Sequence, residues 1–175
     1  MPREHRPIAK LMRIILANSD KDLIPITDEL SAIGLYLKLE LLRFNGKFTY
    51  KIDCASDLFE FKIPSFLLQP FIENAIWHGL LHKKEHGTVT VRLNKMNATI
   101  YISVEDDGIG REESSRINSH KKIQKDSYGI AISQKRINLL NNEIYTSPAN
   151  LKIIDLMDGD VPIGTRVEIE LPILN

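Results

Sequence analysis

The segment from Gln69 to Gly79 constrains the fold more than any other part of the chain, because it has the pattern of an amphipathic helix with two distinct faces. Pro70 suits the first turn of such a helix, where a missing N–H costs nothing. Asn74 and His78 are four residues apart and therefore lie one above the other on a polar face. The apolar positions follow helical spacing: Leu68, Phe71, Ile72, Ala75 and Ile76. One face should fix this helix to a core while the polar pair faces elsewhere.

Length, charge and cysteine content exclude several classes of protein. The chain has 175 residues, enough for one domain with a real core. Lys and Arg number 23, as do Asp and Glu, so there is no net basic field and we expect no nucleic-acid partner. Cys54 is the single cysteine, so no disulfide can form within the chain. There is no apolar run of membrane-spanning length and no signal peptide, and we expect this chain to be soluble and cytoplasmic.

Two amphipathic helices are predicted at the start of the chain. The first runs from about Arg3 to Asn18, and the second follows Pro25 with Thr27 as its N-cap and ends at the turn residues Asn45-Gly46. The stripe of the first helix is Ile8, Leu11, Met12 and Ile15, and that of the second is Leu30, Ile33, Leu37, Leu41 and Phe44. A helical hairpin with two such stripes has little core of its own. The stripes could pack on the domain that follows, or form a seam for a partner helix or a second copy.

The remaining segments predict mostly antiparallel strands alternating with helices. Short strands are expected at 48–52 and 59–63, and residues 88–93 and 100–104 alternate as an antiparallel pair around a Met96-Asn97 turn. Residues 111–127 are polar and are predicted to form a long loop, either functional or mobile, and Gly129 then opens another helix. Strands at 151–156 and 165–171 finish the chain, with Val167, Ile169 and Leu171 on one face. This order favours an α+β fold, a two-layer α/β sandwich.

Three short motifs could carry chemistry, although each alone is common. They are the helix bearing Glu73, Asn74 and His78; the sequence Asp106-x-Gly108-x-Gly110 at a strand end; and Gly129-Ile130-Ala131 at a helix start. A polar loop with Lys121, Lys122 and Lys125 precedes the third. The chain has no P-loop, no C-x-x-C, no H-E-x-x-H and no G-x-S-x-G. His78, His82 and His86 have metal-site spacing, but the helix should end near Gly79 to Leu81 and so separate them.

In order and spacing, these motifs resemble the ATP-binding (HATPase) domain of the GHKL superfamily, which includes gyrase, MutL and the histidine kinases. Within it the chain is most similar to LytS-like sensor histidine kinases, over about residues 8–174. The stretches that carry the resemblance are Ile63-Pro64, Leu68 to Gly79, Asp106 to Gly110, Gly129 to Ile132 and Gly164-Thr165. Glu29-Leu30, Tyr36-Leu37, Glu40 and Arg43-Phe44 resemble the segment that precedes the domain in that family.

The resemblance implies a Bergerat-type sandwich with a mixed, mostly antiparallel sheet, binding ATP and Mg²⁺. It implies that Asn74 gives an oxygen ligand to Mg²⁺, a hard ion that also keeps waters and phosphates. Asp106 would accept the adenine amino group, with Thr165 nearby. Gly108 and Gly110 would let the backbone approach the base, and Gly129 would do the same at the phosphates. Lys121, Lys122 and Lys125 would belong to the ATP lid, and His78 would lie near the phosphates.

Two features depart from the family pattern, and one residue has two readings. Ala131 stands where a second glycine of the phosphate loop is expected. No Asn-Pro-His-Phe-type acceptor stretch is present, and His5 has none of its neighbours. Glu73 could polarise an acceptor histidine or a water, or could be a solvated helix acid.

The expected function is therefore the catalytic part of a two-component sensor histidine kinase. Residues 1–45 would be the end of its dimerisation helices and 46–175 its catalytic domain. The γ-phosphoryl group of ATP would pass to a histidine upstream of this chain, in the same or a partner subunit of a homodimer, and then to a response regulator. The full-length protein would be anchored in the inner membrane. The alternatives are another GHKL ATPase or serine kinase, and a docking module with a degenerate nucleotide site.

Overall fold

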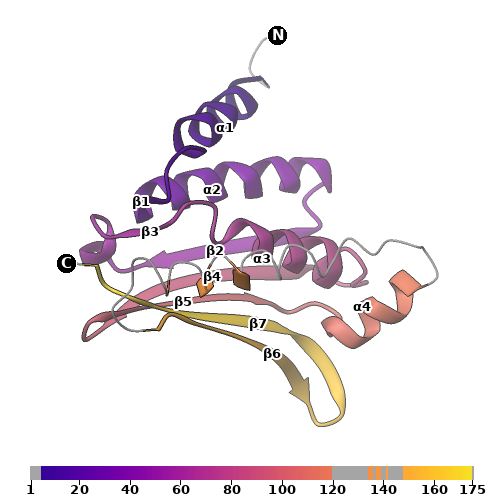
Figure 1. The fold of residues 1–175 in the computed structure, drawn as a ribbon. Helices are drawn as coiled ribbons and strands as arrows, with labels where there is room; N and C mark the ends of the chain where they lie inside the picture. The colour runs from indigo at the N-terminus through magenta and orange to yellow at the C-terminus, as the bar shows by residue number, and fades with distance from the viewer. Residues whose placement is uncertain (1–4, 120–133, 136, 139–140, 142–147, 175) are drawn as a thin grey trace.

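A five-stranded sheet with helices over one face forms the body of the protein (Figure 1). The computed structural model describes residues 5–119, 134, 135, 137, 138, 141 and 148–174. The strand order is β2-β4-β5-β7-β6. The strands are β2 (Phe48–Cys54), β4 (Gly87–Met96), β5 (Thr99–Asp106), β6 (Asn150–Asp158) and β7 (Val161–Pro172). β2 and β4 are parallel and the other pairs antiparallel, so the predicted mixed α+β architecture is confirmed.

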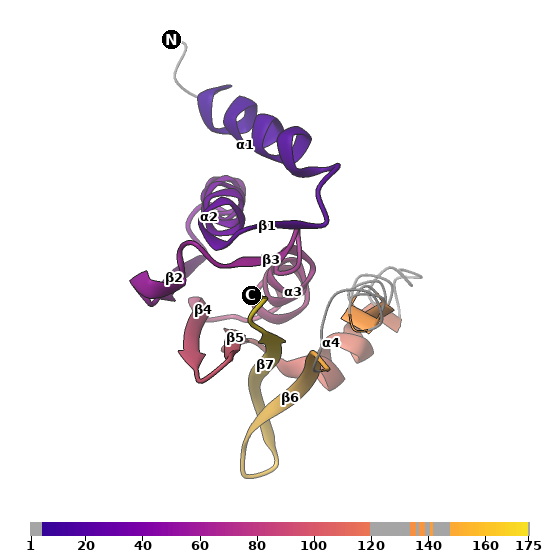
Figure 2. The same ribbon diagram turned by 60° about the vertical axis from the view of Figure 1, so that its left-hand side comes forward.

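The helices α2 (Ile26–Arg43), α3 (Gln69–Asn74) and α4 (Gly110–Ser119) lie on the same side of the sheet (Figure 2). Strand alternation explains why that side is covered. Ile100, Ile102 and Val104 of β5 are 1–2% exposed and face the helices. The opposite face is polar, and there the Glu105 carboxylate accepts a hydrogen bond from Arg166 Nε at 2.6 Å. The sheet therefore needs only one helical layer.

The apolar stripe of α2 packs on the domain that follows it. Ile33 and Leu37 are 2% and 0% exposed and belong to the same core as Phe48 of β2. Of the two readings left open for this helix, packing on the following domain is the one that the structure shows. Thr27 is not its N-cap: the helix begins at Ile26, directly after strand β1 (Leu23–Pro25), and no side chain caps it. The Ile26 N–H instead donates to the Phe61 carbonyl at 2.9 Å, so strand pairing fixes where this helix begins.

The connection between α1 (His5–Asn18) and α2 differs from a simple hairpin turn. It contains β1, which pairs antiparallel with β3 (Lys62–Pro64) in a separate two-stranded sheet. The strand predicted at 59–63 is therefore limited to its end, and a short 3-10 turn, η1 (Ser56–Leu58), precedes it. The chain thus reaches α2 already fixed to the loop that precedes α3.

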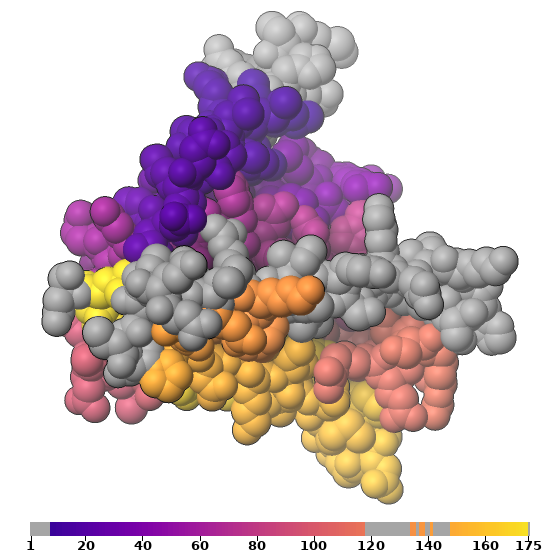
Figure 3. Space-filling view, in the orientation of Figure 1, coloured from indigo at the N-terminus to yellow at the C-terminus, as the bar shows by residue number. Residues whose placement is uncertain are grey.

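Helix α1 projects from the body of the molecule (Figure 3). Leu11 and Ile15 of its predicted stripe are half-buried and lie beside Ala32 and Ile33 of α2. Ile8 and Met12 of that stripe are 47% and 58% exposed. The predicted stripe is thus split, and only part of it packs on α2.

The predicted polar loop 111–127 begins as a helix, because α4 runs from Gly110 to Ser119. Acidic residues in its first turn complement the helix dipole, and Glu112 bonds Arg116 four residues later at 2.8 Å. Of the helix predicted after Gly129, the described residues 134, 135, 137, 138 and 141 are helical, and Ile137 is buried. Within the described ranges, no helix is both long and apolar enough to cross a membrane.

Leu37→Ala should lower the free energy of unfolding by about 2–5 kcal/mol, because it opens a cavity in the shared core. Leu42→Ala on the same helix is the matched control, since Leu42 is 73% exposed and its loss should cost less than about 0.5 kcal/mol. Urea unfolding of both variants measures the difference. Equal costs would contradict the packing of α2 on the domain.

Candidate functional site

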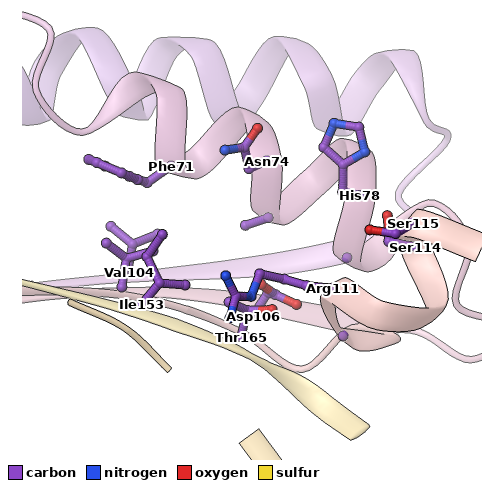
Figure 4. A pocket seen from close by; sticks show the side chains of 14 residues that line it. Phe71, Asn74, His78, Val104, Asp106, Arg111, Ser114, Ser115, Ile153 and Thr165 are labelled. Atoms are coloured by element: carbon purple, nitrogen blue, oxygen red, sulfur yellow. The ribbon is translucent and has the colours of Figure 1, made fainter. Parts of the chain in front are cut away.

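A cavity of about 320 Å³ lies between α3, its continuation and one end of the sheet (Figure 4). Its apolar wall consists of Phe71, Ala75, Val104, Ile153 and Val167. Its polar side chains are Asn74, His78, Asp106, Arg111, Ser114, Ser115 and Thr165. Five of the predicted site residues therefore line one cavity: Asn74, His78, Asp106, Gly110 and Thr165.

The helix that carries Asn74 and His78 is fixed by its apolar face, as predicted. Phe71, Ile72 and Ile76 are at most 1% exposed, and Pro70 lies in the first turn. From Ala75 to Leu80 the helix widens into a π-helical turn, η2, in which the Leu81 N–H donates to the Ile76 carbonyl at 3.0 Å. Such turns are frequent at functional sites. The sequence pattern alone did not reveal this one.

The π-helical turn brings the backbone of Gly79 against the end of β5. A Cβ at Gly79 would collide with the Asp106 carboxylate, and a Cβ at Gly108 would collide with the Gly79 backbone. The Ile109 N–H donates to the Gly79 carbonyl at 3.2 Å. Gly108 thus contributes by allowing this close contact between helix and strand end, and it does not itself line the cavity.

Asp106 is the buried acid of the site, with 4% of its surface exposed. Strand register pairs it with Thr165 of β7, and the Gly108 N–H donates to its Oδ1 at 2.9 Å. Burial raises the pKa of Asp106 from 3.8 to about 7, the charges of Asp107 and Glu105 add to that rise, and backbone hydrogen bonds from Gly108 and Thr165 oppose it. The ionised carboxylate is a rigid hydrogen-bond acceptor. Because it is buried, ionising it inside the fold costs free energy.

Three polar residues of the cavity were missed by the sequence analysis: Arg111, Ser114 and Ser115 of α4. Arg111 is held by a bidentate ion pair with Asp155 of β6, with Nε to Oδ1 at 2.7 Å and Nη2 to Oδ2 at 2.6 Å. That hydrogen bonding lowers the pKa of Asp155. The sequence did contain a signal for this helix: Glu112 and Glu113 follow Gly110, and Arg116 lies four residues after Glu112.

Glu73 does not line the cavity. Its carboxylate accepts a hydrogen bond from Gln69 Nε2 at 2.8 Å, and its charge acts on Tyr36 and Glu40 of α2. Burial, together with the charges of Glu40 and Glu73, raises the pKa of Tyr36 to about 12, against a hydrogen bond from the Trp77 side chain. Glu73 therefore faces α2, and its predicted catalytic role stays a prediction.

The end of α2 packs against the π-helical turn through aromatic and cationic side chains. The Arg43 guanidinium carbon lies 4.6 Å from the Trp77 ring centroid, and the Phe44 and Trp77 rings meet edge to face at 5.3 Å. Arg43 also pairs with Glu40, whose Oε2 is buried and has no hydrogen-bond partner within the described residues. Burial raises the pKa of Glu40. The helix that carries Asn74 and His78 is thus fixed by α2 on the side away from the sheet.

Several predicted site residues lie outside the described residues: Lys121, Lys122, Lys125, Gly129 and Ala131. Among the residues that are described, no group of three or more His, Cys, Asp or Glu side chains could hold a metal ion. An amide such as Asn74 can still give one oxygen to Mg²⁺, which commonly completes its shell with waters and phosphates.

The comparison with protein families decides the family of this chain. Residues 62–175 match the model described as "Histidine kinase-, DNA gyrase B-, and HSP90-like ATPase", known as HATPase_c. The chain belongs to this family. The match covers every cavity residue, which places the candidate site inside the HATPase_c domain.

Relatives of this HATPase_c chain agree with the predicted LytS-like resemblance. The chain is 31% identical over 86% of its length to the sensor protein LytS of Bacillus subtilis and 26% identical over 94% to that of Enterococcus faecalis. It spans about a quarter of the length of these curated relatives. Among solved structures, the catalytic domain of histidine kinase ThkA shares the fold with a TM-score of 0.58 at 12% identity, covering 86% of this chain and 93% of that one.

The Asp106→Asn variant should gain stability relative to the wild type as the pH rises. The native Asp106 keeps its proton up to about pH 7 while the unfolded chain releases it near 3.8, so the wild type loses stability as the pH rises through that window. The amide has no such dependence. The difference in unfolding free energy, variant minus wild type, should therefore rise by about 3 kcal/mol between pH 5 and pH 8.5.

Urea unfolding at both pH values measures this difference. Asp155→Asn is the control that should show no pH dependence in this window: Arg111 lowers the pKa of Asp155 below its ordinary value of 3.8, so this carboxylate is ionised in the folded and the unfolded chain at both pH values. A difference between Asp106→Asn and wild type that does not change with pH would contradict the burial argument.

Proposed function

We propose that this chain is the ATP-binding catalytic domain of a sensor histidine kinase, which binds ATP with Mg²⁺ and transfers the γ-phosphoryl group to a histidine. One observation carries the proposal. A buried carboxylate, Asp106, lies beside Thr165 at the end of a cavity whose other wall carries Asn74 and His78. The family and the LytS relatives support the same conclusion.

The end of the cavity that contains Asp106 and Thr165 suits adenine. Apolar side chains such as Phe71, Val104 and Ile153 form its walls and can contact a flat ring. Asp106 offers an acceptor to an exocyclic amino group, and the Thr165 hydroxyl can donate or accept beside it. Because the Asp106 carboxylate is costly to ionise inside the fold, a donor on the ligand would relieve part of that cost.

The phosphate end is formed by Asn74 and His78 on the helix and by Ser114 and Ser115 on α4. These are oxygen and nitrogen groups of the kind that bind Mg²⁺ and phosphate oxygens. We propose that Asn74 gives its carbonyl oxygen to Mg²⁺ and that His78 lies near the phosphates. Lys121, Lys122, Lys125 and the Gly129 to Ala131 turn would complete the phosphate contacts as the ATP lid.

The reaction proposed is attack of an imidazole nitrogen on the γ-phosphorus. A nitrogen–phosphorus bond forms while the bond to the β–γ bridging oxygen breaks, and ADP leaves. The residues of the chain position the reactants and stabilise charge, which is the main contribution of a protein to phosphoryl transfer. We propose Glu73 as the residue that polarises the acceptor histidine, although it lies on the side of the helix that faces α2.

We propose that this chain acts within a longer protein. We propose that residues 1–45 continue into dimerisation helices, that residues 46–175 act as the catalytic domain, and that the acceptor histidine lies upstream in a homodimer. A response regulator would receive the phosphoryl group, and the full-length protein would be anchored in the inner membrane. The chain spans only about a quarter of the length of these relatives, which agrees with such an arrangement.

Titration with a non-hydrolysable ATP analogue, with and without Mg²⁺, tests this proposal. Asp106→Asn should weaken binding at least about tenfold under both conditions, because an amide presents a donor toward the adenine amino group. Asn74→Ala should remove most of the Mg²⁺ enhancement and change binding without Mg²⁺ little.

The control is Asp107→Asn at pH 8.5, where Asp106 is ionised in both chains; Asp107 accepts a hydrogen bond from the Thr88 N–H at 2.8 Å and does not line the cavity. Its affinity should stay within about threefold of wild type. A wild-type chain that binds no nucleotide at millimolar concentration would overturn the kinase proposal and favour a docking module.

A further inference from the structure

A carboxylate from α2 is buried against the loop that leads into α3. Glu29 lies in the first turn of α2 and is 0% exposed. Its Oε2 accepts a hydrogen bond from the Phe66 N–H and its Oε1 from the Leu68 N–H, both at 2.9 Å. One acid therefore binds two backbone donors 37 and 39 residues further along the chain.

These two donors are at the start of the helix that carries Asn74. Leu68 is the N-cap residue of α3, and its apolar side chain can make no cap of its own. An acid that binds the backbone N–H of an N-cap residue stabilises a helix start in the capping box. Here the acid comes from another helix, so Glu29 joins the beginning of α2 to the beginning of α3.

The backbone between the two bonds has an uncommon conformation. Phe66 has φ of 55°, in the left-handed region that bulky residues rarely adopt. Such a conformation persists only where the surrounding structure enforces it. The bond from Phe66 N–H to Glu29 is a direct restraint of this kind.

The helix beyond this point is a rigid connection to the site. Asn74 follows Leu68 by six helical residues, about 9 Å along the axis. The far end of the same helix is fixed to α2 by Trp77 against Arg43 and Phe44. α2 therefore holds the nucleotide-side helix at both ends, and Glu29 supplies the polar contact at its start.

We propose that Glu29 is a positioning residue for the nucleotide site: through the N–H groups of Phe66 and Leu68 it fixes where α3 begins, and so where Asn74 stands relative to Asp106. This inference rests on the proposed function. Glu29 does not line the cavity, so it acts only through the helix. Helix α2, which precedes the residues matched by the family model, is then part of the site's geometry.

The test compares four chains by affinity for the non-hydrolysable ATP analogue with and without Mg²⁺: wild type, Glu29→Gln, Asp28→Asn and Ile100→Val. Glu29→Gln keeps the size of the side chain but replaces one acceptor with an amide donor. We expect its affinity with Mg²⁺ to fall about three- to tenfold and the enhancement by Mg²⁺ to fall by a similar factor, since Asn74 is displaced.

The two controls separate positioning from charge and from stability. Asp28→Asn removes a neighbouring carboxylate on the same helix turn. Ile100→Val lowers the unfolding midpoint by opening a small gap in the core, at a residue about 20 Å along β5 from Asp106. Both should bind like wild type with an unchanged Mg²⁺ enhancement, because a destabilised but folded chain keeps its site.

Wild-type affinity and Mg²⁺ enhancement in Glu29→Gln would overturn the inference and leave the proposed function intact. An equal loss in Asp28→Asn or Ile100→Val would also overturn it. A wild-type chain that fails to bind would overturn the proposed function together with the inference. If Glu29→Gln does not fold, Glu29→Asp decides: its carboxylate is one methylene too short to reach both amides, so reduced Mg²⁺ enhancement supports the inference and wild-type behaviour refutes it.

Discussion

The burial of the Asp106 carboxylate is the constraint on which the site depends. It requires a strand end that is closed off from water, and the π-helical turn closes it by bringing Gly79 against Gly108. That contact leaves no room for a side chain at either glycine. The buried acid in turn has a pKa of about 7, which makes a hydrogen-bond donor on a ligand valuable. Packing within the protein therefore explains why Gly79 and Gly108 are glycines.

The helix opposite Asp106 is held between two layers. Its apolar face packs on the sheet, while α2 contacts it from behind through Glu29 at one end and Arg43 and Phe44 at the other. The polar side chains of that helix are divided accordingly: Asn74 faces the cavity, and Glu73 faces α2. A movement of α2 would be transmitted to Asn74 through these contacts. The geometry of the site thus depends on a helix that lies before the residues matched by the family model.

Sequence patterns predicted the parts of this fold that depend on periodicity. Strand alternation placed Val167 and Ile169 in the core, and helical spacing put Asn74 and His78 on one face. Contacts between distant segments were beyond such patterns. Because β1 pairs with β3, α2 begins at Ile26 and not after the predicted N-cap Thr27. The residues around Glu29 gave no sign that its carboxylate would bind backbone amides of another segment. The helix containing Arg111 was missed because its polar composition resembled a loop, although its charge spacing was helical.

The most direct test of the central claim is the affinity for the ATP analogue compared with its inosine counterpart, both with Mg²⁺ at pH 8. The two ligands differ at the exocyclic group that would meet Asp106: adenine carries an amino donor, and hypoxanthine carries an oxygen that would face the carboxylate. We expect the adenine ligand to bind at least about 100-fold more tightly than the inosine ligand. Equal affinities would contradict the assignment of Asp106 as the acceptor for adenine.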